Sequence, residues 1–291
     1  MLHTDLAQRM KQNINPPFNI KSEKAIGKFR AAILNHYSEH GRVLPWRSTD
    51  NPYYIFVSEF MLQQTQVERV LKKYGPFIEA FPDFLTLHNA RLQRVLSVWQ
   101  GLGYNRRCLY MKMCASLIQQ RYNGWLPDSV ETLIQLPGIG RATASAIVTF
   151  SYNKPTVFLE TNIRTVFLYF FCPEEQKVSD SAILPLIERT LDVQNPRTWY
   201  YALMDYGTML KSSMRNLNKR STTYRKQSPF EGSKRQVRGK VLKILIAEPH
   251  LSAYEIALRV NNDPSKVRKI LFELGTEGFI RKNGKMYRIS E

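Results

Sequence analysis

The chain has 291 residues, an apolar fraction of 43% and a formal net charge of +18 at pH 7. Its length exceeds that of one typical domain, and no apolar run approaches the roughly 18 residues that a membrane span needs. The large positive charge indicates a polyanionic partner. Because residues 1–19 also lack the apolar core of a secretion signal, we expect a soluble protein of the cytoplasm or nucleoid, without a membrane partner.

The helical signals begin after an N-terminal extension, residues 1–21. Ser22 is a predicted helix cap, and Ile26, Phe29, Ile33 and Tyr37 then recur at the three- and four-residue steps of one helix face. Further helices are expected near residues 52–60, 67–80, 89–98, 104–121, 128–135, 141–152, 160–171, 180–191 and 197–210. No strand signal occurs before residue 275, so residues 22–210 are predicted to form a mainly α-helical domain.

The cysteine content argues against a disulfide or metal framework. Cys108, Cys114 and Cys172 cannot form a paired set, and their spacing fits no zinc or iron–sulfur template. We expect buried or incidental thiols and no bound metal.

A strongly basic segment follows the helical domain. Residues 211–240 contain ten Lys or Arg against one acid, Glu231. We interpret residues 211–233 as a basic linker that follows phosphates, with an ordinary solvated linker as the alternative. The cations expected to contact DNA there are Lys219, Arg220, Arg225 and Lys226.

The last segment, residues 234–291, has the pattern of a winged helix-turn-helix. Three helices are expected over residues 236–247, 252–260 and 264–277, followed by a hairpin that turns at Asn283-Gly284. The third helix carries Lys266, Arg268 and Lys269, which suit a DNA groove. Such modules also serve as protein contact surfaces, and the sequence leaves both uses open.

The segment Leu136 to Thr143 predicts a turn between two helices. Pro137 ends one helix, Gly138 and Gly140 permit backbone angles that other residues avoid, and a new helix then begins. Bare N–H groups at the start of that helix, beside Arg141, would form a site for a phosphate oxygen. A lone carboxylate, Glu160, follows the next apolar segment, an unusual neighbour for a phosphate site.

A second polar cluster lies near the end of the predicted helix 52–60. Glu59 and Gln63 are four residues apart and would share a face if the helix includes both, and Gln64 and Gln66 follow where the helix ends. A surface helix could carry these residues for solubility alone, so the segment by itself does not define a site.

Several motifs together resemble one known family. They are Leu44-Pro45-Trp46-Arg47, Ser58 to Val67, Trp99 to Tyr104, Leu136 to Thr143, Asn162 and Ala202 to Gly207. Over about residues 24–210 the chain resembles the helix-hairpin-helix (HhH-GPD) DNA glycosylases, most closely the MutY adenine glycosylase branch. The resemblance implies two helical subdomains with the active site between them: a six-helix part over about 44–154, and a second part formed by 22–43 and 155–210.

The resemblance also implies roles for individual residues. A glycosylase must turn the target nucleotide out of the duplex, and Gln63 and Gln64 match the residues that fill the gap. Glu160 stands where the family has an aspartate that stabilises the cationic sugar, and Glu59 matches the acid that protonates the departing purine. Asn162 matches the residue that positions the sugar-side group. The remaining matched positions are Gln66, Gly138, Gly140, Arg141 and Thr143 for DNA contacts, and Trp46, Arg47, Leu62 and Tyr201 for the base pocket.

The residue at position 142, an alanine, bears on whether the enzyme also cuts the DNA strand. Bifunctional relatives such as endonuclease III have a lysine at this position, which forms a Schiff base with the sugar and then cuts the strand. Alanine cannot form that bond. The sequence therefore predicts a monofunctional enzyme that leaves an intact abasic site.

The chain departs from the family pattern at four points. Glu160 is one methylene longer than the usual aspartate, and no cysteine follows Cys172, so the iron–sulfur cluster is expected to be absent. The winged module replaces the usual C-terminal reader of 8-oxoguanine. Tyr201 stands where the branch has Gln or Glu on the adenine edge, and it could equally be a core residue.

We therefore expect a monomeric, metal-free DNA glycosylase acting on double-stranded DNA with a mispaired or damaged base, adenine by default. A thymine or uracil mismatch glycosylase is the alternative within the same class, and Glu59 would matter less there because a pyrimidine leaves more easily as its anion. A non-catalytic damage sensor or DNA-binding regulator is the alternative from another class.

Overall fold

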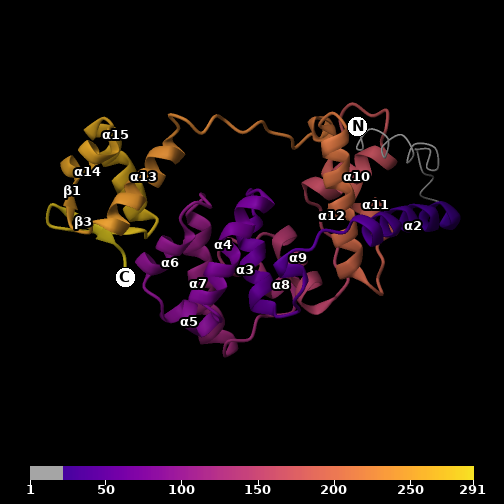
Figure 1. The fold of residues 1–291 in the computed structure, drawn as a ribbon, viewed down its shortest axis with the longest axis horizontal. Helices are drawn as coiled ribbons and strands as arrows, with labels where there is room; N and C mark the ends of the chain where they lie inside the picture. The colour runs from indigo at the N-terminus through magenta and orange to yellow at the C-terminus, as the bar shows by residue number, and fades with distance from the viewer. Residues whose placement is uncertain (1–21) are drawn as a thin grey trace. The chain divides into compact units, whose positions relative to one another are not determined.

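The computed structural model describes residues 22–291, and the predicted N-terminal extension lies outside the described residues. The described part is mainly helical (Figure 1). Its residue contacts divide it into two compact units. Of the described residues, the first unit comprises 22–52, Asp128–Val130 and Gly140–Lys226, and the second comprises Tyr53–Pro127, Glu131–Ile139 and Gln227–Glu291. The predicted domain limits at 210 and 233 stay predictions. Between residues 22 and 291 no helix is long and apolar enough to cross a membrane.

The first unit combines helices that come before and after residues 53–139 in the sequence, most of which belong to the second unit. Its elements are α2 (Glu23–His40), η1 (Pro45–Arg47), α9 (Arg141–Tyr152), α10 (Thr161–Phe170), α11 (Asp180–Thr190), α12 (Pro196–Ser213) and η2 (Leu217–Arg220). Helix α12 packs along both α10 and α2 (Figure 1).

An aromatic cluster forms the centre of this unit. Phe29 on α2 is fully buried, and its ring meets those of Phe167, Phe170 and Trp199 edge-on at 5.2 to 5.8 Å. The predicted apolar stripe on α2 is thus confirmed at Ile26, Phe29 and Ile33, while Tyr37 at its end is only half-buried.

The second unit contains nine helices of the described residues, and the first of them, α3, is largely buried. They are α3 (Pro52–Leu62), α4 (Val67–Ala80), α5 (Phe84–Asn89), α6 (Leu92–Trp99), α7 (Arg106–Tyr122), α8 (Val130–Leu133), α13 (Lys234–Ala247), α14 (Ala253–Val260) and α15 (Pro264–Thr276). The helix expected near residues 89–98 is present as α6, which begins at Leu92. The short helix α5 was not predicted; Asp83 caps it by accepting from Thr86 N at 2.7 Å. The chain extends at Ala90 before α6 begins.

The C-terminal segment forms the predicted three helices and hairpin, with one additional strand. Ser252 and Asp263 cap α14 and α15 as predicted. Strands β1 (Leu251–Ser252), β2 (Ile280–Asn283) and β3 (Met286–Ile289) pair antiparallel in the order β1-β3-β2. The expectation of no strand before residue 275 is therefore wrong. A two-residue strand leaves no alternating pattern, and its strand geometry comes from pairing with β3.

Candidate active site

Glu160 lies immediately before α10 and caps that helix with its carboxylate. Its Oε1 accepts hydrogen bonds from the backbone N–H groups of Asn162 at 2.8 Å and Ile163 at 2.9 Å. These N–H groups lie at the positive end of the helix dipole, which favours a negative charge there. The N-terminus of α10 thereby holds the half-buried Glu160 carboxylate in one orientation.

Asn162, the predicted sugar-side residue, contacts Glu160 directly. Its side-chain Nδ2 donates to Glu160 Oε2 at 3.3 Å, and its Oδ1 accepts from Lys211 Nζ at 2.6 Å. The structure therefore brings two of the predicted catalytic residues together within the first unit. Both carboxylate oxygens of Glu160 have defined partners as a result.

Glu59 lies on α3, in the second unit. Seven of the eleven residues of α3 are buried, including its neighbours Ser58 and Phe60. Glu59 is half-buried and makes further contacts of its own. A helix so largely buried is not a solubilising surface helix, which removes the main argument for the solubility interpretation of this segment.

The glutamine segment follows the end of α3 as a tight turn. Gln63 lies beyond the helix, so the condition for a helix face shared with Glu59 is not met. Gln64 has φ +53, in the left-handed region that non-glycine residues seldom adopt. Such backbone strain clusters at functional sites, where the surrounding structure enforces it.

Arg107 is the residue that enforces this turn, and it was not predicted. Its Nη1 donates to the carbonyls of Phe60 and Met61, both at 2.8 Å, and to that of Gln63. Its Nη2 donates to Thr65 Oγ1 at 2.9 Å. Burial lowers the pKa of Arg107 to about 10. The guanidinium thus satisfies the last carbonyls of α3 and fixes the glutamine segment.

The hairpin contains one glycine that the backbone requires and one that it does not. Gly138 has φ +77, and a Cβ added there would lie 2.6 Å from Tyr110 Cδ2. Gly140 has φ −84 and ψ 168 and open space around it, so its predicted need for special backbone angles is wrong. Gln63 Nε2 donates to Gly138 O at 3.3 Å, which joins the glutamine turn to the hairpin.

Helix α9 begins directly after Gly140. A glycine has no side-chain oxygen, so it offers the first turn no side-chain cap. Arg141 is exposed and Thr143 is half-exposed, and both make contacts of their own.

The predicted base-pocket residues divide between the two units. Trp46, Arg47 and Tyr201 are buried in the first unit, while half-buried Leu62 ends α3 in the second. The Tyr201 ring stacks on Phe150 at 4.5 Å, and the Arg47 guanidinium lies 4.5 Å from the centre of the Tyr201 ring. Tyr201 thus lies between Phe150 and Arg47 and is buried, which is the environment of a core residue.

Asp205 on α12 explains why Arg47 is held there. Arg47 Nη1 and Nη2 donate to the Asp205 carboxylate at 2.8 and 2.9 Å, and Arg42 Nε donates to it at 2.6 Å. Burial raises the pKa of Asp205, but the hydrogen bonds and charges of the two arginines outweigh burial and hold the pKa below its ordinary value. The Leu44 to Arg47 motif is thereby tied to α12.

The predicted linker cations differ in their surroundings. Lys219, Arg225 and Lys226 are exposed. Arg220 instead donates to the carbonyls of Cys172 and Glu175 and so binds the segment around η2 to the rest of the first unit.

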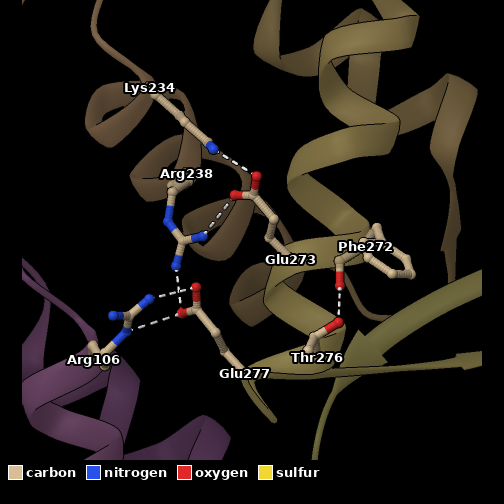
Figure 2. A network of polar contacts seen from close by, with 7 residues as sticks. All are labelled: Arg106, Lys234, Arg238, Phe272, Glu273, Thr276 and Glu277. Carbon is tan, nitrogen blue, oxygen red and sulfur yellow. Dashed lines mark hydrogen bonds and ion pairs between the residues drawn. The ribbon is translucent and has the colours of Figure 1, made fainter.

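The predicted DNA-contacting helix of the winged module is α15. The acids on this helix and directly after it are already paired: Glu273 with Lys234 and Arg238, and the C-cap residue Glu277 with Arg238 at 2.6 Å and Arg106 at 2.7 Å (Figure 2). The predicted DNA-contacting cations of the same helix are exposed: Lys266, Arg268 and Lys269. The exposed charge on α15 is therefore predominantly positive.

The cysteines are buried thiols, as expected. Burial raises the pKa of Cys172 to about 11 and raises the pKa values of Cys108 and Cys114 further. Across residues 22–291, no three side chains of His, Cys, Asp or Glu gather in a way that could hold a metal ion.

Comparisons with known proteins agree with this fold and these motifs. Residues 57–187 match the family profile of the HhH-GPD superfamily base excision DNA repair proteins. The adenine DNA glycosylase of Mycolicibacterium smegmatis is 33% identical over 237 residues, which cover 73% of this chain and 78% of the relative. That of Buchnera aphidicola subsp. Baizongia pistaciae is 37% identical over 184 residues, which cover 62% of this chain and 52% of the relative.

A solved structure supports the same class of fold. A thermostable thymine-DNA glycosylase aligns with a TM-score of 0.56 at 22% identity, over 62% of this chain and 85% of that chain. The fold is thus one that DNA glycosylases use.

The chain belongs to the HhH-GPD superfamily of base excision DNA repair proteins. This membership confirms the resemblance recognised in the motifs. The chain spans about half the length of several of the relatives that it matches, with 52 to 55% covered in three of them.

Proposed function

We propose that the protein is a monofunctional DNA glycosylase of base excision repair. It would hydrolyse the N-glycosidic bond of a mispaired or damaged base in double-stranded DNA, with adenine as the default base, and act as a monomer. Family membership and relatives named adenine DNA glycosylases support this proposal. The observation that carries it is the Glu160 carboxylate, which the N-terminus of α10 and Asn162 hold in a fixed orientation.

Glu160 would stabilise the transition state. As the glycosidic bond breaks, positive charge develops on the sugar, and a pre-oriented carboxylate lowers the energy of that charge. A carboxylate that must reorganise during the reaction would contribute less. Because the N–H groups of Asn162 and Ile163 already hold Oε1, little reorganisation is needed, and the longer glutamate side chain still has a defined position.

Glu59 would be the general acid. A purine leaves readily only when a ring nitrogen takes up a proton, which Glu59 would donate as the bond between that base and the anomeric carbon breaks. Water would then bond to the anomeric carbon and give a proton back to the Glu59 carboxylate. The half-buried position of Glu59 on the largely buried helix α3 supports this role. The proposed reaction balances without a metal or another cofactor.

The glutamine turn and the hairpin would hold the distorted duplex. Gln63 and Gln64 would occupy the gap left by the extruded nucleotide, with Gln66 nearby, and the hairpin from Gly138 to Thr143 would contact the backbone. The strained angle at Gln64 and the four hydrogen bonds that Arg107 donates to the end of α3 and the glutamine turn support a preformed wedge. Exposed cations of the linker and of α15 would add phosphate contacts.

Ala142 supports the monofunctional assignment. It is exposed in the first turn of α9, and a methyl group offers no nucleophile to the sugar. Tyr201 contributes less to the assignment of the base, since its position between Phe150 and Arg47 supports a core role.

A panel of duplexes tests the proposal. The full chain is incubated with duplexes containing A:G, A:8-oxoguanine, G:T, G:U or a hypoxanthine pair, and abasic sites are then revealed with alkali. We expect strand breaks at A:G only after alkali. Breaks before alkali would overturn the monofunctional assignment, and product only from G:T or G:U would favour the pyrimidine alternative. Binding without any abasic product would favour the damage sensor.

A further inference from the structure

Lys211, in the last turn of α12, joins the proposed catalytic carboxylate through one intermediate. Its Nζ donates to Asn162 Oδ1 at 2.6 Å, and Asn162 Nδ2 donates to Glu160 Oε2 at 3.3 Å. A continuous line of hydrogen bonds therefore runs from an ammonium group through an amide to a carboxylate. All three residues belong to the first unit.

A close contact between two helices makes this line possible. Gly207 lies one turn before Lys211 on α12, and a Cβ added to Gly207 would lie only 2.2 Å from the carbonyl oxygen of Asn162. The backbone of α12 thus touches the first turn of α10. With a larger residue at position 207, Lys211 would be displaced from Asn162.

The chemistry of the lysine decides which way the amide faces. An ammonium group has three donors and no acceptor, so it can bond only to the oxygen of the Asn162 amide. The amide nitrogen must then face Glu160. If the amide turned over, its NH₂ group would meet the ammonium donor to donor, and Glu160 Oε2 would lose its hydrogen-bond donor.

We propose that Lys211 is a positioning residue of the glycosylase site, whose charge locks the Asn162 amide so that this amide holds the Glu160 carboxylate. The inference rests on the proposed function for its effect on catalysis. The structural link itself does not depend on that function.

The charge of Lys211 is coupled to that of Glu160. Burial lowers the pKa of Lys211, the Glu160 carboxylate raises it, and Arg164 lowers it. Arg164 is itself paired with Asp180 through bonds of 2.9 and 3.0 Å. Removing the Glu160 charge should therefore make Lys211 release its proton at lower pH.

An NMR titration tests the link without any activity. The side-chain nitrogen of Lys211 is titrated in the wild-type chain and in Glu160→Gln. We expect a lower pKa of Lys211 in the variant, and the side-chain signal of exposed Lys28 on α2 serves as the control in both proteins. An unchanged Lys211 titration would overturn the proposal.

Single-turnover excision tests the consequence for catalysis. Lys211→Met should slow excision by about 10- to 100-fold, as a loosened catalytic group does. Duplex affinity should change much less. Lys211→Arg keeps the charge and the donors and should recover most of the rate, whereas Lys28→Met, which also removes one charge, should leave it unchanged.

Each other result has a definite meaning. A full rate in Lys211→Met, or a loss that Lys211→Arg does not repair, would overturn the positioning role. If the wild-type chain excises no base at all, the proposed function fails, and the NMR titration still decides whether Lys211 and Glu160 are linked.

Discussion

Glu160 and Asp205 are two carboxylates of the first unit with different surroundings. Glu160 is half-buried, and its partners are two backbone N–H groups and the amide of Asn162. Asp205 is 3% exposed, and its partners include the guanidinium groups of Arg42 and Arg47. Dipoles hold the first group, and full opposite charges hold the second.

The difference indicates how one chemical group serves two purposes. A carboxylate neutralised by two guanidinium groups has little charge left for a ligand, and breaking such a buried pair is costly. A carboxylate oriented by amides keeps its net charge, which can then stabilise a cation that forms beside it. We therefore expect Glu160 to matter for catalysis and Asp205 to matter for stability.

The largest expected effect that separates Glu160 from Asp205 is the loss of excision when the Glu160 charge is removed. Glu160→Gln removes the charge but keeps an oxygen that can accept from the N-terminus of α10, so the fold should persist. Excision should slow by about 1000-fold, the upper range for loss of one electrostatic stabiliser. Single-turnover assays with the preferred duplex measure this. Glu188→Gln, a change at an exposed position of α11, should retain the wild-type rate.

The next effect is expected at Asp205. Asp205→Asn leaves two arginines without their carboxylate and should lower the free energy of unfolding by about 3 kcal/mol. Urea unfolding at pH 7 measures this loss. Asp50→Asn, a change at an exposed position, should cost far less.

The pH dependence of the Asp205 effect has a definite sign. The pKa of Asp205 is lowered in the folded state, so its ion pairs stabilise the protein above the unfolded-state pKa of about 3.9, and this contribution disappears as the pH falls through the lower folded-state pKa. The gap in stability between the wild type and Asp205→Asn should therefore narrow below about pH 4. A gap that stays constant down to pH 3 would contradict this account of Asp205.

A smaller effect is expected for the linker cations, which also divide into one that bonds to the fold and others that are exposed. Arg220 bonds to carbonyls of the fold, whereas Arg225 and Lys226 are exposed. Arg225→Gln with Lys226→Gln should reduce the slope of log affinity against log salt by about 0.9 per lost phosphate contact. Arg220→Gln should leave that slope unchanged and lower stability by about 1 to 3 kcal/mol. An unchanged slope in the double variant would rule out linker contacts with phosphate.

Local signals in the sequence were sufficient for most helices and for the hairpin. Ser22, Ser252 and Asp263 cap the helices that they were expected to begin, and Gly284 takes a positive φ in the predicted turn. The motif match placed Asn162 beside Glu160. These features depend on residues a few positions apart, which is why the sequence alone could indicate them.

The residues that the sequence did not reveal act over long separations. Arg107 holds carbonyls 44 to 47 positions before it, and Lys211 reaches Asn162 across 49 positions. No periodicity or cap signal records such contacts, because they depend on how α7 packs near the end of α3 and how α12 approaches α10. Short elements were missed for a related reason, since β1 depends on its partner strand.

The most direct test measures excision and stability on the same three preparations: the wild-type chain, Glu160→Gln and Asp205→Asn. Excision is followed at a temperature where all three are folded. The account predicts that Glu160→Gln loses excision with near-normal unfolding free energy, and that Asp205→Asn loses stability while it still excises the base. Undiminished excision by Glu160→Gln would contradict the central claim that this carboxylate stabilises the reacting sugar.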